Sequence, residues 1–195
     1  MKKVEPTKAE QTQERILQAA TEEFAAYGIA GGRVDRIALA AHANKALIYS
    51  YFGSKEHLFR AVLERHLKDV YRTVHFRADD LPGYAAGLFD FAMDHPHLMR
   101  LVMWNGLEQR PDWPLEDRSS FATQVEEIRN AQSESLVTNN YPPDFLLTLI
   151  ITLASAWTAA NPFGMSITPD AAERRSSLRT ALSNGVEQLC KPVEK

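Results

Sequence analysis

Apolar residues recur along this chain at steps of three and four residues, and this spacing constrains the fold more than any other feature. In the first such segment they are Ile16, Leu17, Ala20, Phe24 and Tyr27, which share one face of a helix. Similar spacing returns in later segments, and no stretch reads as a convincing strand. The sequence therefore predicts an all-α protein.

Proline and glycine indicate where these helices begin and end. Thr7-Lys8-Ala9-Glu10 matches a capping box, and Gly28 is a normal choice just after a helix. Proline suits the first turn of a helix, where its missing N–H is not needed, so each proline break beyond residue 78 predicts a helix start. The predicted helices number about nine and span residues 8–27, 33–41, 45–52, 55–78, 83–94, 96–108, 116–139, 142–160 and 169–190.

Two of the predicted helices are short and are separated by His42-Ala43-Asn44, with a longer helix on each side. This is the plan of a helix-turn-helix, in which the second short helix enters the major groove of DNA. Its inward residues are Ile48 and Phe52, and its outward residues mix hydrogen-bond donors, a cation and aromatic rings. We therefore expect an N-terminal DNA-binding domain over residues 1–54. A C-terminal helical domain over 55–195 should follow, and the helix 55–78 should bridge the two.

Charge is distributed unevenly between the two ends of the chain. The 195 residues carry a net charge of −3, yet residues 1–75 hold 12 Lys and Arg against 9 Asp and Glu. A basic N-terminal part followed by an acidic remainder favours a polyanionic partner that contacts the N-terminal part alone. No apolar run approaches the roughly 18 residues of a membrane span, and the start carries no signal peptide, so we expect a cytoplasmic protein without a membrane partner. A single cysteine, Cys190, excludes an intrachain disulfide.

Four strings of residues between positions 12 and 65 carry a resemblance to a known family. They are Ile16-Leu17-Gln18-Ala19-Ala20, Phe24-Ala25-Ala26-Tyr27-Gly28, Ile37-Ala38 and Leu47-Ile48-Tyr49-Ser50-Tyr51-Phe52-Gly53-Ser54-Lys55-Glu56-His57-Leu58-Phe59. With them the chain resembles the tetracycline-repressor (TetR/AcrR) family of bacterial regulators. The remainder resembles that family only in length and helical character. The resemblance implies a dimeric DNA-binding regulator, usually a repressor, that responds to a small molecule.

The resemblance also implies a role for particular residues at the DNA. Arg33 would contact backbone phosphates, and Lys55 would hold a phosphate at the start of the fourth helix. The hydroxyls of Tyr49 and Tyr51 would form hydrogen bonds with phosphates and set the register of the protein on the DNA. The sequence departs from the family pattern at three positions. His42 replaces the usual turn glycine, and Ala46 and Leu47 replace the common Gly-Thr, so that Leu47 could instead touch a thymine methyl. The predicted DNA-contacting residues are Arg33, Asn44, Lys45, Ala46, Leu47, Tyr49, Tyr51 and Lys55.

The middle helices are rich in large apolar residues, and any one of these is more often part of a core than of a pocket, but the concentration of Met and Trp, which adapt their shape, favours a cavity. We predict a pocket for a small apolar effector there, with His95, His97, Asn105 and Gln124 as candidate polar anchors. The predicted lining residues are Phe91, Met99, Met103, Trp104, Phe121, Val125 and Trp157. An effector in this pocket would shift the fourth helix and so move the DNA-binding domains.

The last two predicted helices, 142–160 and 169–190, carry apolar faces that suit a homodimer. The second has a narrow stripe of Leu178, Leu182, Val186 and Leu189, and two helices from each chain would make a four-helix bundle. A symmetric dimer requires a near-palindromic operator of double-stranded DNA. The alternative is a helical binding protein of the same fold that has lost DNA binding. No Gly-rich phosphate loop, His-Glu-x-x-His, paired Cys or Gly-x-Ser-x-Gly is present, so we expect no enzyme, cofactor or metal.

Overall fold

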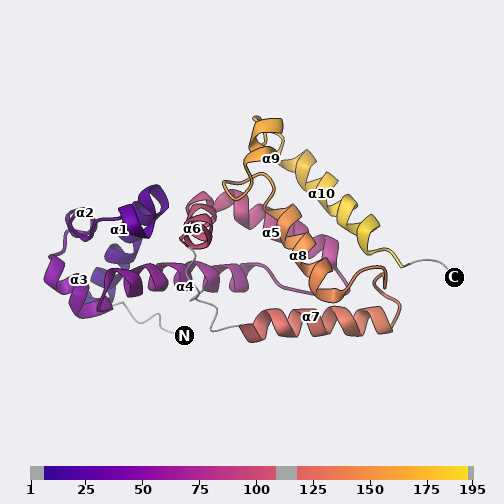
Figure 1. Cartoon of the computed structure of the whole chain (residues 1–195), viewed down its shortest axis with the longest axis horizontal. Coiled ribbons are helices and arrows are strands. Elements are labelled where there is room, and N and C mark those ends of the chain that lie inside the picture. Colours follow the sequence, from indigo (N-terminus) through magenta and orange to yellow (C-terminus); the bar gives the residue numbers. More distant parts are fainter. Residues whose placement is uncertain (1–6, 109–117, 193–195) are drawn as a thin grey trace. The chain divides into compact units, whose positions relative to one another are not determined.

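The computed structural model of the chain describes residues 7–108 and 118–192, with the side chains of residues 118–120 left aside. Over these ranges it forms ten α-helices and no strand (Figure 1), which confirms the predicted all-α class. None of these helices has both the length and the apolar character needed to cross a membrane. The helices are α1 (Lys8–Gly31), α2 (Val34–Ala40), α3 (Lys45–Phe52), α4 (Lys55–Thr73), α5 (Leu81–Asp94), α6 (Pro96–Leu107), α7 (Arg118–Ser133), α8 (Pro143–Ala154), α9 (Pro162–Ile167) and α10 (Arg175–Cys190).

The helices fall into two compact units that differ from the domains expected at a boundary near residue 54. Unit 1 comprises the described residues up to Leu67 together with those from Arg100 to Glu108, and unit 2 comprises Lys68–Met99 and residues 118–192. Both α4 and α6 are therefore shared. The first part of α4 and the last part of α6 belong to unit 1.

Local capping signals set most helix ends in unit 1. Thr7 and Glu10 form the predicted capping box at the start of α1, with the Glu10 amide donating to Thr7 Oγ1 over 3.2 Å. Asn44 caps α3 by accepting a hydrogen bond from the Leu47 amide at 2.7 Å. Gly53 ends α3 with a φ of 76°, and Ser54 caps α4 through the amide of His57. These short helices begin and end where their sequence signals stand.

Gly28 ends the first regular segment of α1, as predicted, with the non-helical angles φ 68° and ψ −176°. Only glycine adopts such a pair of angles without steric cost. The prediction missed the further helical turn that follows this kink and extends α1 to Gly31. The turn after α2 behaves as anticipated for a position that usually holds glycine, because His42 takes a φ of 50°.

The core of unit 1 fixes α3 against its neighbours. Ile48 is the buried residue of α3, and α2 packs against both α1 and α3. The rings of Phe24 in α1 and Phe59 in α4 meet edge to face, with centroids 5.4 Å apart. Because one face of α3 is buried in this way, its opposite edge faces outward.

Unit 2 is organised around α5, which contacts both α8 and α10 (Figure 1). Leu178, Leu182 and Val186 of α10 are buried within the single chain. Arg175 pairs with Asp90 and Asp94 of α5, and Arg179 donates to Asp90 over 2.7 Å. The narrow stripe predicted for dimerisation is thus used mainly inside one protomer.

Several predicted boundaries in unit 2 are wrong. α7 ends at Ser133 because Ser135 takes a φ of 59° and the chain turns back, with the Leu136 amide donating to Ala131. α8 ends at Ala154, and α10 begins only at Arg175. The prediction gave no helix to residues 161–168, yet the Asn161-Pro162 start signal holds there: Asn161 caps α9 through the amide of Phe163.

Candidate nucleic-acid interface

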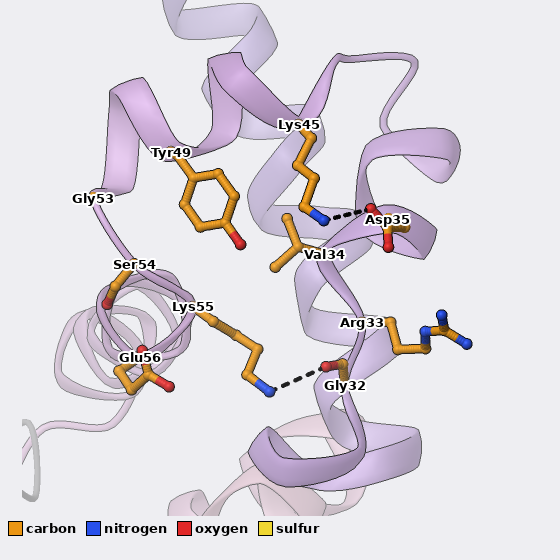
Figure 2. Close-up of a pocket in the computed structure, with 10 residues that line it drawn as sticks. All are labelled: Gly32, Arg33, Val34, Asp35, Lys45, Tyr49, Gly53, Ser54, Lys55 and Glu56. Carbon is orange, nitrogen blue, oxygen red and sulfur yellow. Dashed lines mark hydrogen bonds and ion pairs between the residues drawn. The ribbon is translucent and has the colours of Figure 1, made fainter.

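The start of α2, one edge of α3 and the start of α4 enclose an open hollow of about 430 Å³ (Figure 2). We call it the cradle. Its walls combine backbone at Gly32 and Gly53 with cationic, hydroxyl and carboxylate side chains. The cradle is lined by Gly32, Arg33, Val34, Asp35, Lys45, Tyr49, Gly53, Ser54, Lys55 and Glu56.

Lys45 and Asp35 form an ion pair across the wall of the cradle. The Lys45 ammonium lies 2.8 Å from Asp35 Oδ1, and both side chains are more than half exposed. The hydrogen bond from Lys45, and then its charge, lowers the pKa of the Asp35 carboxyl, and the same pair raises the pKa of Lys45. Lys45 is therefore charged and held at the opening of α3.

Lys55 reaches back from the first turn of α4 to the chain before α2. Its ammonium donates to the carbonyl of Gly32 over 3.3 Å (Figure 2). The hydroxyl of Tyr49 points into the space between Lys45 and Lys55, while the guanidinium of Arg33 points away from it. Two ammonium groups and a phenol thus face one hollow that is the size of a phosphate group or larger.

The structure brings together some, but not all, of the residues predicted to contact DNA. Arg33, Lys45, Tyr49 and Lys55 line the cradle. Ala46 is exposed and Leu47 half-buried on α3, outside the cradle, and Asn44 lies exposed at its cap. The ring of Tyr51 is half-buried and meets Phe52 edge to face.

Sequence reasoning missed Asp35 as a component of this surface. An aspartate in the first turn of a helix is ordinary, because it stabilises the positive end of the helix dipole. Its pairing with a lysine on the next helix depends on how α2 and α3 pack. The only sequence signal for this pair was that Asp35 and Lys45 carry opposite charges on two short helices joined by a tight turn.

The residues predicted to line an effector pocket are divided between the two units. Phe91, Met99, Phe121, Val125 and Trp157 belong to unit 2, where Phe91 stacks on His95 and Trp157 meets Phe89 edge to face. Met103 and Trp104 belong to unit 1, and the indole N–H of Trp104 donates to the carbonyl of Ala25. The pocket itself stays a prediction.

A buried polar pair in unit 2 joins α5 and α7. Gln124 is buried and its Oε1 has no hydrogen-bond partner, while its side chain is hydrogen-bonded to Tyr84. Burial raises the pKa of Tyr84 to about 12, so its hydroxyl stays neutral. Over the ranges that the structure describes, no three His, Cys, Asp or Glu side chains are grouped as metal ligands would be.

Comparison with known proteins identifies the family of both parts of the chain. A model described as "Bacterial regulatory proteins, tetR family" matches residues 16–62, and one described as "Tetracyclin repressor-like, C-terminal domain" matches residues 80–188. The HTH-type transcriptional repressor SCO4008 of Streptomyces coelicolor is 40% identical over 156 residues, covering 78% of this chain and 81% of that protein. The repressor NicS of Pseudomonas putida is 33% identical over 114 residues, covering 54% and 53%.

Solved structures agree. The transcriptional regulator SCO4942 from Streptomyces coelicolor superposes with a TM-score of 0.80 at 36% identity, covering 92% of this chain and 98% of that one. GusR of Salmonella enterica, at 18% identity, shows the shared fold alone, with a TM-score of 0.69 over 96% of this chain and 99% of that one. Members of this family bind DNA operators, dimerise and bind small-molecule effectors. The chain belongs to the tetR family of bacterial regulatory proteins, and it is a ligand-responsive DNA-binding regulator and not an enzyme.

Proposed function

We propose that this regulator is a repressor that binds a near-palindromic operator as a homodimer and is released by a small, mainly apolar molecule. The observation that carries the DNA-binding part is the convergence of Lys45, Tyr49 and Lys55 on one open hollow. Such a group of donors suits a backbone phosphate, and it positions the outer edge of α3 in the major groove. Both curated relatives named above are called repressors.

Within this proposal, the residues of α3 divide by task. Lys45, Tyr49 and Lys55 contact phosphates, with Arg33 beside them, and fix the register. Asn44, Ala46, Leu47 and Tyr51 face the base edges or the flanking backbone. Leu47, half-buried where the family commonly carries threonine, makes an apolar contact with a thymine methyl.

The dimer is formed by α8 and α10, as the sequence predicts, but through their outer faces. Phe145 of α8 is 52% exposed in the single chain. On α10 the exposed residues Ser177, Ala181 and Gly185 are small and stand four residues apart, and a Cβ built at Gly185 meets no atom within 4 Å, which leaves room for a second helix to approach closely. A two-fold axis there pairs α8 and α10 with their copies.

The effector is neutral, largely apolar and carries one hydrogen-bond donor. Gln124 offers a buried acceptor without a partner, and an unpaired buried acceptor is costly unless something else satisfies it. We expect neutral alkylphenols to raise the melting temperature more than their methyl ethers, which lack the donor. Gln124→Leu should abolish that difference, and equal shifts for both series would contradict this role.

Selection of bound duplexes from a randomised library tests DNA binding. The enriched sequence, which we call the selected duplex, is compared by fluorescence anisotropy with a random duplex of equal length at two salt concentrations. We expect salt-sensitive binding with a preference for the selected duplex, and a roughly threefold to tenfold loss for Lys45→Ala and Lys55→Ala on both duplexes. Arg129→Ala, which removes an exposed cation of α7, is the matched control and should change neither.

Two outcomes would overturn the proposal. Absence of salt-sensitive binding to any duplex would favour the alternative, a helical binding protein without DNA affinity. If the selected duplex placed at a promoter raises transcription of a reporter in the presence of the protein, the regulator is an activator.

A further inference from the structure

The kink in α1 leaves backbone groups without the partners that a continuous helix gives them. In a regular α-helix the amide of residue 29 donates to the carbonyl of residue 25. The angles of Gly28 turn Ile29 away from that position, and a new helical turn begins, with the Gly32 amide donating to the Gly28 carbonyl over 3.0 Å. The first amides of the new turn and the Ala25 carbonyl therefore need other partners.

The last two turns of α6 supply these partners. Arg100 Nε and Trp104 Nε1 donate to the Ala25 carbonyl over 2.7 and 3.2 Å. A single carboxylate oxygen, Glu108 Oε1, accepts from the amides of Ile29 and Ala30 over 2.9 and 3.0 Å. Both sides of the broken turn are thus satisfied from one helix.

The spacing along α6 fits this task. Arg100, Trp104 and Glu108 are four residues apart, so they share one helix face, and the Glu108 amide still donates to the Trp104 carbonyl as in a continuing helix. Gly28 provides the room, because a Cβ there would lie 2.8 Å from Trp104 Cε3. We call this set of contacts between α6 and the broken turn the clasp.

The turn that the clasp holds is adjacent in sequence to residues of the cradle. The turn that Glu108 holds, Ile29 to Gly31, leads directly into Gly32 and Arg33, which line the cradle. The carbonyl of Gly32 is the one that Lys55 contacts, and the amide of Arg33 is held by Glu23 over 2.8 Å. A displacement of the turn therefore moves one wall of the phosphate site.

We propose that Arg100, Trp104 and Glu108 are positioning residues for DNA binding, although none of them belongs to the helix-turn-helix. They replace the hydrogen bonds lost at the kink, and by holding the turn Ile29–Gly31 they set the place of Gly32 and Arg33 in the cradle. This rests on the proposed DNA-binding function. DNA binding by the cradle would then depend on α6, a helix that lies within the residues matched by the C-terminal domain model.

The test combines duplex binding with amide hydrogen exchange in the full-length protein. We expect Glu108→Ala to weaken binding of the selected duplex about tenfold, because hydrogen bonds to a charged group are strong, and to weaken binding of the random duplex as well, because both duplexes place phosphates in the cradle. Glu108→Gln keeps an acceptor oxygen and should lose about threefold. In Glu108→Ala the amides of Ile29 and Ala30 should exchange faster.

The matched control is Glu127→Ala, which removes an exposed carboxylate of α7. Both substitutions make the protein more positive, which by itself strengthens binding to DNA. A loss in Glu108→Ala together with no loss in Glu127→Ala therefore reports position and not charge. Trp104→Phe keeps an aromatic ring and removes the indole donor together with part of the indole packing, so it tests the clasp should Glu108→Ala unfold.

Three results are distinguishable. If the wild-type protein binds no duplex, the proposed function fails, and the positioning role fails with it. If the wild type binds but Glu108→Ala and Trp104→Phe bind the selected duplex within twofold of it, the clasp is overturned alone. Accelerated exchange at Ile29 and Ala30 together with weaker binding supports it.

Discussion

Unit 1 and unit 2 are both helical, but their helix ends have different causes. In unit 1 the short helices α2 and α3 run Val34–Ala40 and Lys45–Phe52, close to the predicted 33–41 and 45–52. In unit 2 the predicted helices 116–139 and 142–160 are both too long. Residues that cap α3 and α4 stand in the sequence beside the ends that they make. The end of α7 instead depends on the left-handed conformation of Ser135, and α8 ends where the turn that follows it packs against α9.

Gly164 illustrates the second case. A Cβ at this position would lie 1.8 Å from the carbonyl oxygen of Ala156, so the backbone of α9 presses against the turn that follows α8. No local pattern near Ala154 announces that contact. A helix end of this kind becomes visible only when the neighbouring segments are in place.

The largest expected effect tests whether the two units unfold separately. Phe24 in unit 1 and Phe89 in unit 2 are both 0% exposed. Truncation of either to Ala should lower the free energy of unfolding by about 3–5 kcal/mol. In hydrogen exchange, Phe24→Ala should reduce the protection of backbone amides in unit 1 only. Phe89→Ala should reduce it in unit 2 only. Loss across the whole chain in either variant would mean that the units fold as one.

Cap residues offer a sharper version of the same comparison. Asn44 caps α3 and Asn161 caps α9, each through a backbone amide. Substitution by Ala should cost about 1 kcal/mol at each site. Only Asn44→Ala should also weaken binding of the selected duplex, roughly fivefold, since about 1.4 kcal/mol corresponds to a tenfold change. If Asn161→Ala weakens binding of the selected duplex equally, the loss in Asn44→Ala does not come from the cap of α3 in particular.

The fold class, the helix-turn-helix and four of the ten residues that line the cradle could be predicted from sequence, because they depend on local signals. The period of the apolar residues predicts helices, and the short helices are bounded by Asn44, Gly53 and Ser54. Asp35 and the contacts of Trp104 could not be predicted, because they depend on pairings between helices. The glycine signal at Gly28 correctly predicted a break in the helix, but it could not predict that a further turn would follow to Gly31.

Asp35 should have a smaller effect, and in the opposite direction. Asp35→Asn removes a carboxylate from the cradle, so binding of the random duplex should strengthen roughly twofold to threefold. Asp144→Asn, in the first turn of α8, changes the net charge equally and is the control. Equal strengthening in both variants would show that net charge alone is responsible, and fluorescence anisotropy at constant salt measures the difference.

The smallest expected effect concerns Cys190, which is buried at the end of α10. Burial raises the pKa of its thiol from an ordinary value of 9.0 to about 11, so the thiolate is about 100-fold rarer at neutral pH. Alkylation by iodoacetamide at pH 8 should therefore be slow in the native protein and fast in urea. Because the fold favours the neutral thiol, its contribution to stability is complete at neutral pH. It is lost only as the pH rises from the unfolded pKa through about 11. Rapid native alkylation would show that the end of α10 opens.

Under the proposed function, the partners that the cradle lysines already hold have a consequence for how the protein searches along DNA. Lys45 already holds Asp35 and Lys55 already holds the Gly32 carbonyl, so an arriving phosphate replaces a partner instead of meeting a bare cation. A bare contact releases about 0.9 counterion per phosphate. A contact made by exchange with a carboxylate releases less, so the ionic-strength dependence should be shallower than the number of cations suggests. The protein should then bind unrelated sequences weakly while it slides along them. Long residence times should be limited to duplexes whose backbone fits the cradle.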